Sequence, residues 1–123
     1  MRRPTTTAFR TSALCIAAAA AACGVDPDAL RGPGRGRAPV ADARHLALYL
    51  DHVTFGVSLS ACGRAIARDR ASVRHACARM EDRRDDGDFD HAVAALEHAL
   101  GAQKRLLDAL AVSFTLHPTG DDS

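Results

Sequence analysis

Carboxylate and histidine side chains occur twice in this 123-residue chain at a spacing that suits metal binding. The segments DARHLALYLDH and DFDHAVAALEH each place a carboxylate three residues before a histidine, and they start 46 residues apart. Side chains three apart share one face of a helix, so each pair could reach one ion. The repeated histidines and the helix-starting carboxylates are Asp42, His45, His52, Asp88, His91 and His98. Because His45 and His52 would be about 10.5 Å apart along a helix axis, a metal or haem site would need histidines from both segments.

Each member of this pattern also has an ordinary structural explanation. Asp42 and Asp88 are residues favoured at a helix start, and His91 and His98 fall at the polar edge of a predicted helix. A metal- or haem-binding helical protein is therefore the alternative interpretation, and we expect no cofactor. The chain has no glycine-rich phosphate loop, CxxCH or HExxH motif, so we predict that it is not an enzyme.

The first 24 residues have the layout of an export signal, with a basic start, a short apolar core and a small-residue end. The sequence Ala20-Ala21-Ala22-Cys23 resembles the lipobox of bacterial lipoproteins. That resemblance implies a signal peptide over residues 1–22 and a lipid such as palmitate on Cys23. It places the protein in the bacterial cell envelope, anchored to the outer membrane or facing the periplasm. Secretion without a lipid and an organelle transit peptide are the alternatives.

From the charge balance of the remaining chain we expect no nucleic-acid partner. Removing residues 1–22 takes away three of the 16 basic residues and leaves 13 against 15 acidic ones, a formal charge of −2. Residues 23–40 are rich in glycine and proline and lack apolar periodicity, which predicts a flexible linker behind the lipidated cysteine. Residues 117–123 are predicted to be a disordered tail.

Helical periodicity extends over residues 41–116 and predicts an all-α domain, a helical hairpin plus a third helix like a three-helix bundle. The first helix starts at Asp42 and continues past Leu59. The second carries Ile66, Val73, Cys77 and Met80 on one stripe, and the third runs from Phe89 to Phe114. The acidic sequence around Gly87 separates the second helix from the third.

Cys62 and Cys77 are predicted to form a disulfide, because an oxidising envelope favours pairing of two such cysteines. A hairpin that turns at Asp69-Arg70 would place them opposite each other, at a separation a disulfide can bridge. A turn at Gly63, the residue type usual just after a helix end, would instead bring the histidines of the two segments level. We favour the disulfide, because within one monomer the two arrangements exclude each other.

The sequence therefore predicts a small lipid-anchored envelope protein that acts as a non-enzymatic binding or structural accessory. With the favoured turn, the first and third helices would extend past the second and expose apolar residues such as Leu46 and Leu110. We expect self-association or a helical protein partner there, with His45, Tyr49 and His52 inside the contact. The membrane is the other expected partner, through the lipid.

Overall fold

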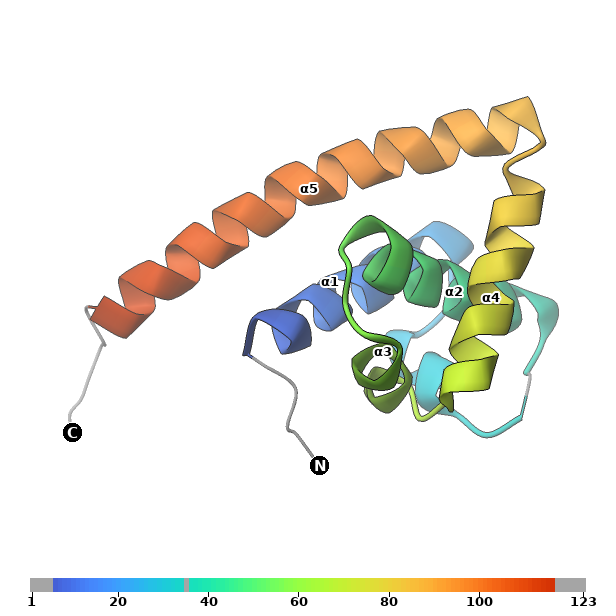
Figure 1. Cartoon of the computed structure of the whole chain (residues 1–123), viewed down its shortest axis with the longest axis horizontal. Helices are drawn as coiled ribbons and strands as arrows, with labels where there is room; N and C mark the ends of the chain where they lie inside the picture. Colours follow the sequence, from blue (N-terminus) through green and yellow to red (C-terminus); the bar gives the residue numbers. More distant parts are fainter. Residues whose placement is uncertain (1–5, 35, 117–123) are drawn as a thin grey trace.

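The computed structural model describes residues 6–34 and 36–116, and the regular secondary structure of these residues is entirely helical (Figure 1). The five α-helices are α1 (Thr6–Cys23), α2 (Ala38–Tyr49), α3 (Leu59–Ala65), α4 (Arg70–Arg83) and α5 (Gly87–Leu116). A 3-10 helix, η1 (Pro27–Arg31), precedes α2, and a π-helical turn, η2 (Leu50–Thr54), continues it. The predicted all-α class is confirmed. The predicted hairpin and third helix account for only part of the helices found.

Helix α1 is a core helix, although by length and composition alone it could cross a membrane. It lies alongside α2 (Figure 1), and its alanines allow the two backbones to approach closely. Its inward side chains include Cys15, Ile16, Ala19 and Ala20, all buried. The apolar residues Leu46, Leu48 and Leu50 of the first predicted helix were expected to be exposed. They are buried, because both residues 6–23 and α4 pack against this helix.

Part of the segment predicted as a flexible linker is ordered against the core. Asp26 caps η1 by accepting a hydrogen bond from Asp28 N at 2.8 Å, and Leu30 is fully buried. Arg44 Nε of α2 donates to Leu30 O at 3.0 Å. The predicted tail, residues 117–123, lies outside the described residues.

The long first helix predicted from Asp42 is interrupted after Thr54. Gly56 adopts a left-handed φ of 72°, which reverses the chain after η2. Ser58 then caps α3, because its Oγ accepts from Ala61 N at 3.1 Å. Both residue types are sequence signals for a helix end and a helix start, so α3 could have been predicted as a separate helix.

The turn between α3 and α4 lies at residues 66–69, where Asp69 caps α4 by accepting from Ser72 N at 2.8 Å. Gly63 is inside α3 and does not form the turn. Its Cα faces the backbone of the turn that follows α3. A Cβ there would lie 2.2 Å from the carbonyl oxygen of Arg68. The glycine therefore permits a close approach between α3 and the turn.

Helix α5 begins at the corner after α4 and extends well past the other helices (Figure 1). Val93 and Leu100 of its first half are buried in the core, whereas Leu106, Leu110 and Phe114 of its second half are exposed. Arg84, between α4 and α5, fixes the corner. It forms ion pairs with Asp90 and with Glu97 Oε1, the latter at 3.0 Å.

We expect Gly63→Ala to lower the free energy of unfolding by about 2 kcal/mol, because the added methyl group overlaps a backbone oxygen that cannot rotate away. Gly87→Ala is the matched control, since its Cβ would have no neighbour within 4 Å. We expect its effect to be smaller than about 1 kcal/mol. Chemical denaturation measures both variants, and equal stability of the two would contradict the close approach.

The two faces of α1 provide a second test. Ala19 is fully buried and Ala17 is exposed. Ala19→Asp is expected to cost about 3 kcal/mol or more, because it buries a carboxylate without a partner. Ala17→Asp should cost about 1 kcal/mol or less. Thermal unfolding of both variants distinguishes a core helix from a detached N-terminal segment, for which neither substitution would change the stability of the domain.

Candidate functional site

Helices α3 and α4 form two packed helices joined by a short turn, an arrangement called a helix-turn-helix. Cys62 of α3 and Val73, Ala76 and Cys77 of α4 are buried where the helices meet the rest of the core. The tight turn depends on the close approach at Gly63, and its Ala67 has a left-handed φ of 57°. We call residues 59–83 the α3–α4 unit.

The side of α4 that faces away from the core is exposed and carries two small side chains and a histidine. Val73 and Cys77 mark the buried side. At 100° per residue, Ala71, His75 and Ala78 lie opposite them, and all three are exposed. Two alanines on this face leave the helix backbone accessible to a partner.

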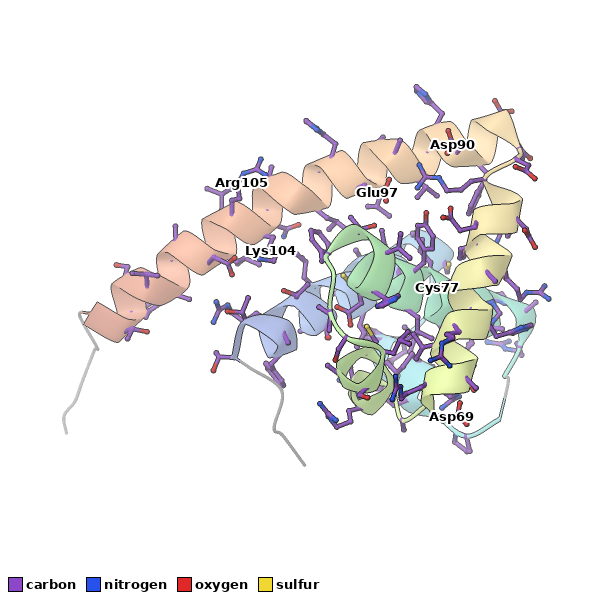
Figure 2. All side chains as sticks on the ribbon, viewed as in Figure 1. Asp69, Cys77, Asp90, Glu97, Lys104 and Arg105 are labelled. Atoms are coloured by element: carbon purple, nitrogen blue, oxygen red, sulfur yellow. The ribbon has the colours of Figure 1, made fainter. Side chains whose placement is uncertain are left out.

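Positive charge is concentrated on this unit. Residues 59–79 contain one carboxylate, Asp69, and five arginines, which gives a local charge of +4. The arginines are Arg64, Arg68, Arg70, Arg74 and Arg79. Figure 2 shows Asp69 at the end of α4 that is farther from α5.

The opposite corner of the molecule has the reverse charge. Residues 81–90 contain six carboxylates and two arginines, and the acidic Asp90 lies near the start of α5 (Figure 2). The protein is therefore polarised along α4, with its basic end at the turn and its acidic end at the α4–α5 corner.

Arg68 connects the turn to the segment before α2. Its Nη2 donates to Gly32 O and Gly34 O, both at 2.8 Å, and its Nη1 donates to Ala67 O at 3.0 Å. A groove of about 640 Å³ between α2 and α4 has Arg68, His75 and Arg79 in its lining. Arg68 therefore braces the basic end of the unit.

Two ionisable groups at this end have shifted pKa values. The backbone N–H of Ser72 donates to Asp69 and lowers the pKa of that carboxyl. In the groove, burial lowers the pKa of His45, and the positive charge of Arg79 adds to the effect. Asp69 therefore stays ionised as the helix cap, and His45 favours its neutral form.

The predicted metal residues do not come together. His52 Nδ1 is 2.7 Å from Val57 O, and Asp42 Oδ1 is 3.7 Å from an Arg83 guanidinium nitrogen. On α5, Asp88, His91 and His98 are exposed. Among the described residues, no group of three histidine, cysteine, aspartate or glutamate side chains is arranged to hold a metal ion. The structure gives no support to a metal or haem site.

The cysteines predicted to be modified or paired form no disulfide among the described residues. Cys23 is at the end of α1, and Cys62 and Cys77 lie in α3 and α4 without a disulfide between them. Burial raises the pKa of Cys62 and raises that of Cys77 to about 11. Buried thiols with raised pKa values are poor nucleophiles. Tyr49, predicted to lie in a contact with another chain, is covered by its own chain, and its hydroxyl donates to Glu81 at 3.0 Å.

The arginines of the α3–α4 unit were not identified as functional from the sequence. They flank the predicted apolar stripe of the second helix, and the formal charge of −2 for residues 23–123 does not reveal them. A count over a short window would have found them, because five arginines occur between residues 64 and 79.

Comparison with protein families gives one match. The model described as "Bacterial dnaA protein helix-turn-helix" matches residues 14–80, more than half of the chain. The match begins inside α1 and ends inside α4, so it includes the whole turn between α3 and α4. No curated protein and no solved structure matches the chain.

This match overturns the interpretation of the N-terminus as a signal peptide followed by a lipidated Cys23. Residues 14–23 belong to the matched domain, and a short run of alanines suits a buried helix as well as a signal peptide. The predicted envelope location, lipid anchor, membrane partner and accessory role are therefore wrong. The exclusion of nucleic acid is wrong for the same reason.

The matched range contains α3, the turn and all but the last residues of α4. The chain belongs to the bacterial dnaA protein helix-turn-helix family.

Proposed function

We propose that this protein binds double-stranded DNA through the α3–α4 unit, with α4 entering the major groove. In helix-turn-helix proteins the second helix lies in the major groove and its N-terminal residues contact base edges. The single observation that carries the proposal is the exposed, arginine-rich α4 within a domain of this family.

The first two turns of α4 supply the groups for base contacts. Arg70 and Arg74 are exposed, and a guanidinium can donate two hydrogen bonds to guanine O6 and N7. Ser72 and His75 are further exposed polar groups on these turns. The small side chains of Ala71 and Ala78 would let the helix lie deep in the groove.

The flanking arginines would contact the phosphates. Arg64 on α3 and Arg79 farther along α4 are both exposed and lie to either side of the outer face. Phosphate contacts fix the position of a protein on the duplex without reading its sequence. The carboxylates of the α4–α5 corner would be repelled by DNA, so the charge polarity along α4 favours the proposed orientation.

The role we propose is binding without a catalytic step. It would place the protein with the DNA of the cell.

We expect Arg74→Ala to weaken DNA binding about tenfold, because it removes one guanidinium contact from the groove. Arg105→Ala is the matched control, because Arg105 is exposed on α5, far along the chain from the α3–α4 unit (Figure 2). It removes the same charge and should leave the affinity within about twofold. Fluorescence anisotropy with a pool of random short duplexes measures both variants at matched salt.

The salt dependence separates the kinds of contact. If Arg74 binds a phosphate, the slope of log K against log salt should fall by about 0.9 in the variant. If Arg74 contacts a base, the slope of log K against log salt should not change in the variant. Sequences that the variant selects from the pool should then show no base preference at one position where wild type has one. Wild-type protein that fails to bind the pool at low salt, or equal losses in the two variants, would contradict the proposal.

A further inference from the structure

Asp51 is a buried carboxylate at the junction of three elements. It lies in η2, and its side chain meets Ser12 of α1, whose Oγ is 2.6 Å from Asp51 Oδ2. Only 3% of Asp51 is exposed, and Ser12 is also buried. The second oxygen, Oδ1, is buried without a hydrogen-bond partner among the described residues.

The groups that face this carboxyl provide little compensation for a negative charge. They are Ser12 and Cys15 from α1, Cys62 from α3 and the neighbouring His52. Cys62 Sγ is 3.5 Å from Val57 O, to which it donates its weak hydrogen bond. His52 Nδ1 is 2.7 Å from the same carbonyl oxygen. The carboxyl is therefore surrounded by one hydroxyl, two thiols and a histidine engaged elsewhere.

A neutral acid fits this environment better than an anion. Protonated at Oδ2, Asp51 can donate to Ser12 Oγ, since a hydroxyl both donates and accepts. Oδ1 is then a carbonyl oxygen, and burying it without a partner costs less than burying an anionic oxygen. Burial raises the pKa of Asp51, although the hydrogen bond from Ser12 and the charge of His52 act in the opposite direction.

We propose that Asp51 is a neutral carboxylic acid in the folded protein and acts as a pH-sensitive latch between α1 and the α3–α4 unit. Ionisation leaves a buried charge at the place where α1, η2 and α3 meet, and so loosens the attachment of α1. The latch concerns the stability of the fold, and it would operate whether or not the protein binds DNA.

The direction of the pH dependence follows from linkage. A carboxyl whose pKa is raised by folding contributes its full stability below the unfolded value of about 3.9 and loses it as pH rises through the folded value. Asp108 behaves in the opposite way, because hydrogen bonds from Lys104 and Arg10 lower its pKa. Its contribution is lost as pH falls, so the two carboxyls can be told apart by the sign of their effect.

Thermal unfolding of the full chain between about pH 5 and pH 9 tests the latch. The wild-type Tm should fall relative to that of Asp51→Asn as pH rises, because the amide keeps the shape and stays neutral. The difference in Tm between wild type and Asp51→Asn should be small at the lowest pH of this range and reach several degrees at the highest. Asp108→Asn is the control, and its difference from wild type should not grow towards alkaline pH. An Asp51→Asn variant less stable than wild type by the same amount at every pH would overturn the proposal.

Ser12→Ala and infrared spectroscopy provide measurements that do not depend on the folding of Asp51→Asn. Ser12→Ala removes the Ser12–Asp51 hydrogen bond but leaves the burial that raises the pKa of Asp51, so the alkaline fall in Tm should persist. Wild-type protein at neutral pH should show the carbonyl band of a protonated carboxylic acid, which disappears on alkaline titration. A wild-type protein without that band would overturn the proposal.

Discussion

The burial of α1 against α2 is the contact on which the rest of the structure depends. Helix α2 packs on α1 along one side and on α4 along another, so it is the centre of the domain. Without α1, α2 would lose its most extensive packing contact and would have little reason to stay in place for α4. Alanine is well suited to this contact, because small side chains bring the backbones close and leave α1 few apolar groups to bury elsewhere. The Ser12–Asp51 hydrogen bond is a polar contact within this apolar interface.

A second set of contacts fixes the C-terminal end of α4. Arg84 Nη1 donates to Tyr49 OH and to Glu97 Oε1, both at 3.0 Å, and so joins α2 to α5 through the residue that follows α4. Thr54 Oγ1 donates to Glu97 Oε2 at 2.7 Å and adds η2 to the same group. A guanidinium suits this position because its planar N–H groups can serve several acceptors at once. The acidic corner is thus held by ion pairs, while the basic end of α4 remains available to a partner.

The sequence predicted the parts of this fold that depend on local signals. Helical periodicity identified the all-α class, and the acidic stretch around Gly87 marked the start of the last helix within a residue or two. Helical periodicity did not reveal the break at Gly56 and Ser58. These residue types are signals for a helix end and a helix start, but the apolar pattern continues across them. The sequence-based prediction also failed for α1, because a buried alanine-rich helix and the core of a signal peptide have the same composition and differ only in what packs against them. Packing partners are a property of the folded chain, and residues 14–23 alone contain no information about α2.

The candidate site was missed for a related reason. A formal charge summed over the whole chain cancels the arginines of residues 64–79 against the carboxylates of residues 81–90, although most of these arginines lie near the turn and the carboxylates lie at the α4–α5 corner. The same fold explains why Gly63 matters more than its position inside a helix suggests. Because it has no side chain, the carbonyl of Arg68 can approach α3, and the guanidinium of Arg68 then reaches back to the loop before α2. The turn is braced from both sides, and Asp69 starts α4 directly after it. The direction in which Arg70 and Arg74 project therefore depends on Gly63 and Arg68, which belong to the framework of the turn and not to the proposed DNA-reading face.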